Sequence, residues 1–231
     1  MILIVAAMEE EYQELEKLID NGIELCCKGI KYVKGFIDNK DVILMLSGVG
    51  KVNAAYTITT FIDNFDIDFV INIGSAGGVI SKKYDVKVLD IVIAQNVVQH
   101  DVDLVLANRL PGVLPNLPQY YPSSLNNEMI KVLKKTNLRF HLGTIASGDQ
   151  FVGSLTRINE IKNNFVDVCA VEMEAGAIAQ VCYLTNTKYL VFRSISDVIN
   201  GEVDNQTQFE EYIKQASINS ARATYEIIKC L

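Results

Sequence analysis

Residues 169–177 read Cys169-Ala170-Val171-Glu172-Met173-Glu174-Ala175-Gly176-Ala177, so an apolar run ends in two carboxylates and small residues follow. This pattern predicts a buried strand that ends at the glutamates and is followed at once by a helix. In an extended chain, side chains two residues apart share a face, so Glu172 and Glu174 could reach one ligand. Open α/β sheets bind ligands at the carboxyl ends of their strands. Alternatively, both carboxylates only charge the first turn of the helix, where its dipole favours them.

The same alternation of apolar runs and helical patterns continues along the chain. Strands are expected at 2–6, at 24–46 (two or three antiparallel strands), at 69–73, at 88–97, before 147, at 167–171 and at 189–195, and helices at 8–20, 50–64, 125–136, 155–164, 174–184 and 208–229. Apolar strands separated by helices predict an α/β fold: a three-layer α/β/α arrangement with a central mixed, mostly parallel twisted sheet. No repeat or linker interrupts the pattern, so we expect one domain over residues 1–231.

Composition excludes several classes of function. The net charge is −7 and no basic run occurs, which argues against nucleic acid or an anionic membrane surface as a partner. No apolar stretch approaches the roughly 18–20 residues needed to span a bilayer, and the first residues lack a basic signal-peptide region. The five cysteines show no C-x-x-C spacing and only two histidines occur. We therefore expect a cytoplasmic protein with reduced thiols, no catalytic metal and no cofactor.

The segment 98–123 differs from the rest of the chain. It holds Pro111, Pro115 and Pro118 and has no clear periodicity, yet it is rich in leucine and valine. Irregular segments of this length are usually functional or disordered, and the apolar content argues against disorder. We expect this segment either to cover a pocket or to pack on another subunit.

Acidic residues follow the first predicted strand, in the run Met8-Glu9-Glu10-Glu11. Three acids at a helix start suit the helix dipole, so they could form a solvated first turn. One of the three could instead face inward, across the crevice of the sheet.

Two glycine-rich segments follow other predicted strands. Glycines in Gly74-Ser75-Ala76-Gly77-Gly78 would allow a close backbone approach to a ligand, but their spacing is wrong for a dinucleotide fingerprint. The run Gly48-Val49-Gly50-Lys51-Val52 is not a Walker A loop, because neither Ser nor Thr follows the lysine. Both segments could also be plain turns.

The run Arg193-Ser194-Ile195-Ser196-Asp197 ends another apolar strand. An arginine within an apolar strand needs a buried anionic partner or an exit to solvent, and Glu11 and Glu174 are the candidate partners. Asp197 is expected where this strand opens into a polar loop, a setting that can raise a carboxyl pKa and make the group a proton donor. Alternatively, Asp197 caps the loop start.

Three strand ends thus carry carboxylates, without a thiolate-activating histidine or a metal set. Two separated carboxyls suit glycosidic bond cleavage, in which one protonates the leaving group and the other activates water.

Six motifs of this chain together resemble those of a known family. They are, in chain order, Ala7-Met8-Glu9-Glu10-Glu11, Ser47-Gly48-Val49-Gly50-Lys51-Val52, Gly74-Ser75-Ala76-Gly77-Gly78, Ser147-Gly148-Asp149-Gln150-Phe151, Val171-Glu172-Met173-Glu174 and Ser194-Ile195-Ser196-Asp197. Over the whole chain the sequence resembles the bacterial 5′-methylthioadenosine/S-adenosylhomocysteine nucleosidases of the purine nucleoside phosphorylase superfamily. The resemblance implies a nucleoside phosphorylase-like fold and a homodimer that hydrolyses the N-glycosidic bond of adenosine thioethers. Adenine and a thioribose would be released, in methionine and S-adenosylmethionine salvage, and 5′-deoxyadenosine is a further candidate substrate.

The resemblance also implies catalytic roles. Glu11 would activate water, and Asp197, held by Ser196, would protonate adenine N7. Arg193 would help to order the water and Glu174, and Glu174 would bind the ribose hydroxyls.

Further residues are implied to bind the substrate. Phe151 would stack on the base, the Val152 backbone would bind the edge of the base, and Phe209 would close over the purine. Met173 would bind the ribose, with Glu172 nearby. The remaining residues implied to line the site are Ala7, Met8, Val49, Ser75, Ala76 and Gly77.

The nucleophile distinguishes a hydrolase from a phosphorylase. Phosphate needs arginines, and the acidic run that ends at Glu11 would repel a dianion. The hexameric phosphorylases that the chain resembles carry an arginine where this chain has Asn72. Water is therefore the expected nucleophile. A phosphorylase and a non-catalytic nucleoside-binding protein of the same fold are the alternatives.

Two segments depart from the family pattern. Residues 104–112 lack the usual aromatic residues of the 5′-substituent pocket, so the preference among 5′ groups stays open. The leucine-rich region 102–117 is expected at or near a dimer interface, because apolar patches of this kind are usually covered. The loop 199–208 is slightly longer than is usual in the family.

Overall fold

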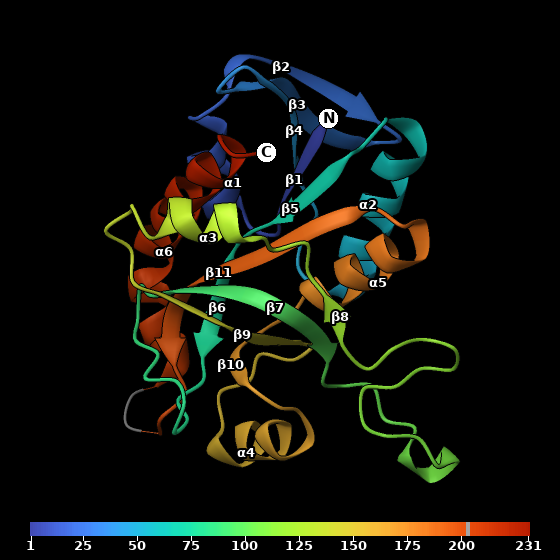
Figure 1. The fold of residues 1–231 in the computed structure, drawn as a ribbon, viewed down its shortest axis with the longest axis vertical. Coiled ribbons are helices and arrows are strands. Elements are labelled where there is room, and N and C mark those ends of the chain that lie inside the picture. The colour runs from blue at the N-terminus through green and yellow to red at the C-terminus, as the bar shows by residue number, and fades with distance from the viewer. Residues whose placement is uncertain (202–203) are drawn as a thin grey trace.

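The computed structural model describes residues 1–201 and 204–231, and their strands form one eleven-stranded sheet in the order β2-β3-β4-β1-β5-β11-β6-β10-β9-β7-β8 (Figure 1). The strands are β1 (Ile2–Ala6), β2 (Asp20–Cys27), β3 (Ile30–Ile37), β4 (Lys40–Leu46), β5 (Phe69–Asn72), β6 (Ser75–Gly78), β7 (Ile91–Gln99), β8 (Tyr121–Pro122), β9 (Phe140–Ser147), β10 (Val168–Glu172) and β11 (Lys188–Val198). The helices are α1 (Glu9–Glu16), α2 (Lys51–Asn64), the 3-10 turn η1 (Val105–Ala107), α3 (Asn127–Leu133), α4 (Leu155–Asn164), α5 (Ala175–Thr185) and α6 (Asn205–Ile228).

The sheet is mixed, as predicted. Its centre is parallel, because β1 pairs with β4 and β5, and β5 pairs with β11, all in parallel. The β2-β3-β4 meander is antiparallel, which confirms the hairpins expected in 24–46. β11 also pairs with β7, so the strands β11, β6, β10, β9 and β7 close on one another.

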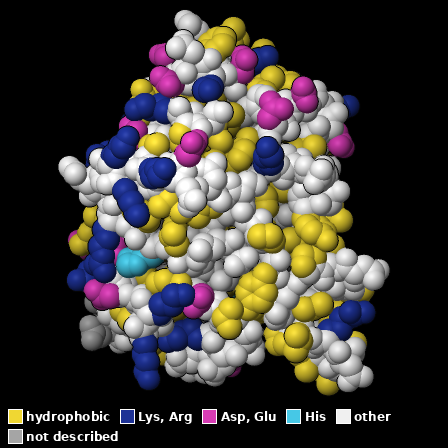
Figure 2. All heavy atoms as spheres, viewed as in Figure 1, with side chains coloured by type: hydrophobic (Ala, Val, Ile, Leu, Met, Phe, Trp, Pro, Cys, Tyr) yellow, Lys and Arg dark blue, Asp and Glu magenta, His cyan; other side chains and the backbone are white. Residues whose placement is uncertain are grey.

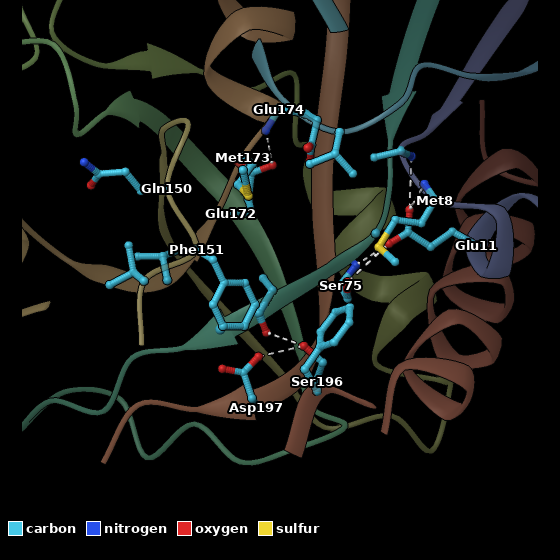
Figure 3. A pocket seen from close by; sticks show the side chains of 18 residues that line it. Met8, Glu11, Ser75, Gln150, Phe151, Glu172, Met173, Glu174, Ser196 and Asp197 are labelled. Carbon is cyan, nitrogen blue, oxygen red and sulfur yellow. Dashed lines mark hydrogen bonds between the residues drawn. The ribbon is translucent and has the colours of Figure 1, made fainter. Parts of the chain in front are cut away.

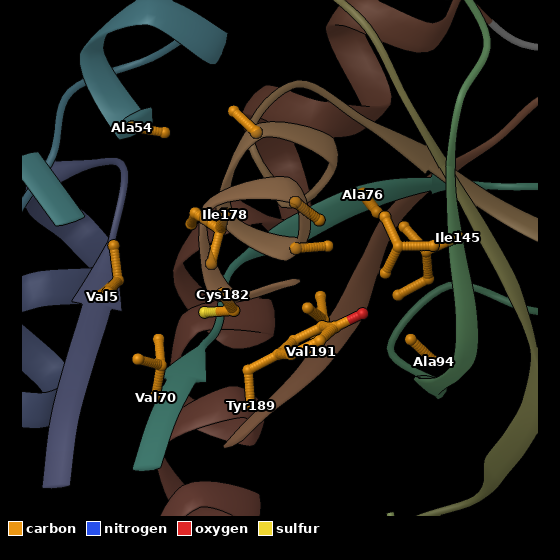
Figure 4. Close-up of a cluster of buried hydrophobic side chains, with 14 of the residues drawn as sticks. Val5, Ala54, Val70, Ala76, Ala94, Ile145, Ile178, Cys182, Tyr189 and Val191 are labelled. Carbon is orange, nitrogen blue, oxygen red and sulfur yellow. The ribbon is translucent and has the colours of Figure 1, made fainter. Parts of the chain in front are cut away.

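Helices cover both faces of the sheet (Figure 1). Helices α2 and α5 contact each other on one face, and α6 contacts α1 and α3 on the other. Side chains of β1 alternate between two cores: Leu3 and Val5 face the α2 and α5 side, while Ile4 faces the α6 side. Figure 4 shows part of the first core, where Ile178 and Cys182 of α5 lie over the sheet. This arrangement confirms the predicted α/β/α layers.

Strand β11 joins the two halves of the sheet. Residues 188–191 pair with β5, and residues 194–198 pair with β6, with a register shift between Ile195 and Asp197. The strand reaches Val198, three residues beyond the predicted end at 195. Asp197 therefore pairs with Gly77 near the end of the strand, rather than lying in an open loop, and its side chain is buried.

Some predicted elements were wrong. The segment 74–78 was expected as a loop or turn, but residues 75–78 form β6, because their backbone pairs with β11 on one side and with β10 on the other. The first helix ends at Glu16 instead of residue 20, because Asp20 pairs with Phe36 in the β2-β3 hairpin. The last helix begins at Asn205 instead of residue 208, because Asp204 caps it. These pairings and caps are tertiary or local details that apolar periodicity does not contain.

Most of the segment 98–123 is irregular, as expected; it holds the last two residues of β7, the turn η1 and the short strand β8. The loop 199–208 of the sequence analysis includes residues 202–203, which lie outside the described residues. Among the described helices, none combines the length and the apolar character of a membrane span.

Candidate active site

A cavity of about 260 Å³ lies at the strand ends that carry the predicted motifs (Figure 3). Its lining contains every residue predicted to bind or act on the substrate except Arg193, which is buried behind it. Gly74, Gln150 and Val171 also line the cavity and were not predicted as site residues. The fold therefore brings six separate sequence motifs to one place.

Glu11 occupies one wall, in the first turn of α1 (Figure 3). Its Oε1 accepts hydrogen bonds from the Ser75 backbone N (2.9 Å) and the Ser75 hydroxyl (3.3 Å), and its Oε2 accepts from the N–H groups of Ala7 (3.1 Å) and Met8 (3.2 Å). Burial raises the pKa of Glu11, and the positive charge of Arg193 and these backbone hydrogen bonds oppose that shift. The result is a fixed, buried carboxyl group that can exchange a proton.

A glycine makes room for this carboxyl group. A Cβ placed on Gly74 would lie 2.9 Å from Glu11 Oε1, which is closer than real Cβ contacts come. Gly74 thus lets the backbone come close to the side chain of Glu11. The sequence had suggested that this glycine allows a close approach to a ligand.

Arg193 is paired mainly with Glu172, a partner that the sequence analysis missed. Its Nη2 donates to Glu172 Oε2 and to Asn72 Oδ1 (2.6 Å), and it lies 3.9 Å from Glu174 Oε2. Of the two partners predicted for Arg193, Glu174 therefore forms only a long ion pair with it. Glu11 forms no ion pair with Arg193, although its pKa responds to the arginine charge. The side chain of Asn72 is thus a hydrogen-bond acceptor for the buried guanidinium of Arg193.

Glu172 and Glu174 have different surroundings. Glu172 accepts hydrogen bonds from the backbone N of Glu174 (3.1 Å) and of Ala175 (2.9 Å to Oε2), so it caps the start of α5 (Figure 3). Glu174 Oε1 instead accepts from the Gly50 N–H (2.9 Å). Burial and the neighbouring charge of Glu172 raise the pKa of Glu174 to about 8, against the opposing effect of Arg193. Glu172 therefore interacts with the start of the following helix, which is the alternative to ligand binding that the sequence left open for both glutamates.

The loop that supplies the Gly50 N–H is held by a second group of acids. Asp149 Oδ1 accepts from the Lys51 backbone N (2.7 Å), and Asp101 Oδ1 accepts from Lys51 Nζ (2.7 Å). Asp101 Oδ2 also accepts from the Asp149 N–H (3.0 Å). Sequence patterns do not single out Asp101 or Asp149, because each contact joins residues about 50 or more positions apart.

Asp197 lies on another wall, at the end of β11. Its Oδ1 accepts from the Ser196 hydroxyl (2.8 Å) and its Oδ2 accepts from Asn205 Nδ2 (2.7 Å). Burial raises the pKa of Asp197, and these two hydrogen bonds partly offset the rise. No capping hydrogen bond of the Asp197 carboxyl to a backbone N–H occurs among the described contacts. Asn205 was missed because the last helix was predicted to begin three residues later.

Two phenylalanines border the cavity. The rings of Phe151 and Phe209 meet edge to face, with centroids 6.0 Å apart and an angle of 85° between the planes. Phe151 is exposed, whereas the adjacent Val152 is buried against α4. A planar ligand could stack on either ring.

Three carboxyl groups of raised pKa, those of Glu11, Asp197 and Glu174, thus line different sides of one cavity (Figure 3). Two such groups can deliver a proton to one side of a bond and remove a proton on the other. In the described part of the chain, no group of three or more His, Cys, Asp or Glu is placed to hold a metal ion.

Comparisons with known proteins agree with the motifs. The model of the phosphorylase superfamily matches residues 1–231. A 5′-methylthioadenosine/S-adenosylhomocysteine nucleosidase of Staphylococcus carnosus (strain TM300) is 38% identical over 235 residues, which cover 100% of both chains. A crystal structure of the Neisseria meningitidis nucleosidase in complex with methylthio-immucillin-A is 35% identical, covers 100% of this chain and 99% of that chain, and has a TM-score of 0.90.

A structure of a futalosine hydrolase mutant of Helicobacter pylori strain 26695 is also similar, with 32% identity, a TM-score of 0.92 and coverage of 100% of this chain and 99% of that chain. These matches confirm the resemblance inferred from the motifs and the nucleoside phosphorylase-like fold. The chain belongs to the phosphorylase superfamily and, within it, to the 5′-methylthioadenosine/S-adenosylhomocysteine nucleosidases.

Proposed function

We infer that this protein hydrolyses the N-glycosidic bond of 5′-methylthioadenosine and S-adenosylhomocysteine and releases adenine and a 5-thio-substituted ribose. Full-length relatives with this name support the activity. The observation that carries the proposal is that Glu11 and Asp197, both buried and both with raised pKa, line different walls of one cavity.

We assign the acid step to Asp197. As the bond between C1′ and N9 breaks, its electron pair stays on adenine, and the ribose gains oxocarbenium character. A proton passes from the Asp197 carboxyl to N7 and neutralises the leaving base, which leaves Asp197 as a carboxylate. The raised pKa of Asp197 supports this role, because an acid must hold its proton until the bond breaks. Phe151 and Phe209 would stack on the purine.

We assign the base step to Glu11. Its carboxylate takes a proton from water, and the water oxygen forms the new bond to C1′. Three backbone N–H groups and the Ser75 hydroxyl fix the carboxylate, which supports a positioned base. A negative charge on Glu11 would also oppose the developing positive charge on the sugar.

Glu174 and Met173 would bind the ribose hydroxyls. With a pKa of about 8, the Glu174 carboxyl can donate a hydrogen bond as well as accept one, which suits a hydroxyl partner. Arg193 would act through Glu172, since the guanidinium is buried behind the cavity and paired there. In this proposal Arg193 is a positioning residue.

Water is favoured over phosphate by the charge of the cavity. No lysine, arginine or histidine is among the described residues that line it, whereas Glu11, Glu172, Glu174 and Asp197 are. A phosphate dianion would meet several carboxyls and no cationic side chain. This lining supports hydrolysis over phosphorolysis.

The test is to incubate the purified protein with 5′-methylthioadenosine in the absence and in the presence of phosphate. We expect adenine and methylthioribose at the same rate in both. Product only with phosphate would identify a phosphorylase. Tight binding without product, unchanged in Glu11→Gln and Asp197→Asn variants, would identify a binding protein.

The substrate panel should vary the 5′ group and include S-adenosylhomocysteine, 5′-deoxyadenosine and futalosine. Futalosine belongs in the panel because the similar Helicobacter pylori structure is described as a futalosine hydrolase. The ratios of kcat/KM among these compounds would rank the 5′ substituents that the unusual residues 104–112 accept.

We also propose that residues 1–231 form one catalytic domain, and that two copies pair in the cytoplasm through residues 102–117. The single sheet supports the first point. The exposed side chains of Val105, Leu106 and Leu110 support the second, since such apolar surface is usually covered. Hydrophobic side chains gather on the lobe that carries this segment (Figure 2).

A further inference from the structure

Asn205 contacts the proposed catalytic acid from outside the strand that carries it. It is the first residue of α6, it is buried, and its Nδ2 donates to Asp197 Oδ2 at 2.7 Å. The same turn of α6 is anchored to the end of β11, because Gln208 Oε1 accepts from the Val198 backbone N at 2.6 Å. The position of the Asn205 amide is therefore set by contacts between two regular elements.

The two partners of Asp197 differ in what they can do. The Ser196 hydroxyl donates to Oδ1 here, but a hydroxyl can also rotate and accept a proton. The Asn205 NH₂ group can only donate, so it needs a lone pair on Oδ2. Ser196 can thus serve both protonation states of Asp197, whereas Asn205 favours the carboxylate.

This difference matters in the proton transfer proposed above, on which the inference rests. Before the bond breaks, burial favours the protonated form of Asp197. Afterwards a carboxylate remains in a buried place, and it needs a donor that is already in position. We propose that Asn205 is a positioning residue of this enzyme, which holds the Asp197 carboxyl against the cavity and stabilises the carboxylate left after adenine is protonated.

The surroundings of Asp197 make this effect measurable. The causes that act on its pKa are burial, which raises it, and the hydrogen bonds from Asn205 and Ser196, which lower it. In the part of the chain that the structure describes, no charged side chain of β6, β10 or α6 contributes to the shift. Loss of the Asn205 amide should therefore raise the pKa of Asp197, since no charged group among the described residues is placed to compensate.

The experiment measures the pH dependence of adenine binding by calorimetry and of kcat/KM for 5′-methylthioadenosine. It compares the wild type with Asn205→Ala, with Asn205→Asp, which keeps the shape but replaces the amide by a carboxyl, and with Asp197→Asn.

Adenine affinity should fall as Asp197 loses its proton, and this fall should be absent in Asp197→Asn. In Asn205→Ala the fall should move about 1–2 pH units higher, and further in Asn205→Asp. At its plateau, kcat should drop about tenfold in Asn205→Ala, because the acid is weaker.

Gln206→Ala is the matched control. Gln206 lies in the same turn, is exposed and contacts Glu210 rather than Asp197, so its pH profile should match that of the wild type. A merely structural role of Asn205 would lower activity or stability without the ordered shift from wild type to Ala to Asp. Unshifted or downward-shifted profiles in both Asn205 variants would overturn the inference. A wild type that binds adenine but releases none from the nucleoside would contradict the proposed function, while the binding profiles would still test Asn205.

Discussion

Glu11 illustrates how one residue of a repeated run acquires a different environment. Glu9, Glu10 and Glu11 are consecutive, but only Glu11 is buried and hydrogen-bonded to Ser75, Ala7 and Met8. The sequence located the run and allowed one inward member. The turn geometry of α1 decided which member it is, because successive helical residues point about 100° apart.

The change Glu11→Gln keeps the size of this side chain and removes its ability to accept a proton from water. We expect kcat for adenine release to fall by about 10²–10⁴-fold. The dissociation constant of adenine should stay close to that of the wild type, because Glu11 is assigned to the water side of the bond. A stopped assay of adenine release with calorimetric adenine binding checks both values. An equal loss of adenine binding would contradict a role confined to the base step.

Glu172 is predicted to matter for stability more than for chemistry. Glu172→Gln would leave the buried guanidinium of Arg193 without its main counter-charge and weaken the cap of α5. We expect a loss of about 3–5 kcal/mol in the free energy of unfolding, the size typical of breaking one partner of a buried pair. Glu160→Gln, which breaks the exposed pair with Arg157, should cost less than about 1 kcal/mol. Denaturant titrations measure both, and equal losses would refute this distinction.

At the level of elements, the loop before α2 positions Glu174. Gly50 has φ +97°, and a Cβ there would lie 3.2 Å from Asp149 Oδ1. Its N–H is the donor to Glu174 Oε1. The loop therefore needs glycine for its backbone conformation and for its approach to the two acids.

Gly50→Ala should disturb the hydrogen bond to Glu174 and raise the KM for the nucleoside, while adenine binding changes little because Glu174 is assigned to the ribose. Gly29→Ala is the control: its φ is +84° and it has open space around it, in the turn between β2 and β3. Both variants should lose about 1 kcal/mol of stability from backbone strain. Only Gly50→Ala should change KM in steady-state assays. A KM change of the same size in Gly29→Ala would show that strain alone is responsible.

At the scale of the whole molecule, the buried carboxyls link stability to pH. The pKa of Glu174 is raised from 4.5 to about 8 in the folded state, so the folded state holds a proton that the unfolded state releases. The contribution of this group to stability is thus present below about pH 4.5 and is lost as the pH rises through about 8.

Glu174→Gln removes this titration and keeps the shape of the side chain. We expect the wild type to lose stability between about pH 5 and about pH 8.5, and the variant to lose less over the same range. Glu11 and Asp197, whose pKa values are also raised, remain in the variant, so its loss should be smaller but not zero. Urea midpoints at the two pH values give the comparison. An identical loss in both proteins would contradict the raised pKa of Glu174.

The proposed pairing of two copies also belongs to this scale. Leu106→Asp places a charge on the most exposed of the large hydrophobic side chains in the segment 102–117 and should weaken self-association. Ile23→Asp is the control, because Ile23 is another exposed apolar side chain and lies on β2. This change should leave self-association unaffected. Sedimentation velocity over a range of concentrations measures the effect. Equal association of the two variants would place the interface elsewhere.

Local patterns of residues and contacts between distant residues carry different information about this fold. Element types followed from periodicity, because burial of one face or of both faces leaves a local pattern of apolar residues. Element ends were less accurate, since the helix at 8–20 stopped at Glu16, and one element type was wrong, since β6 was expected as a loop. Both errors concern residues whose state is decided by pairing with another strand, in the neighbouring hairpin for Asp20 and far along the chain for β6.

The sequence by itself determined the α/β class and the motifs of the family, since residue types and local spacing carry both. It also determined which carboxyls stand at strand ends. Only the tertiary structure decided that Glu172 rather than Glu11 pairs with Arg193 and that Asn205 contacts Asp197. The physical reason is that a hydrogen bond or an ion pair depends on distances of a few ångströms, which the packing of the whole sheet fixes.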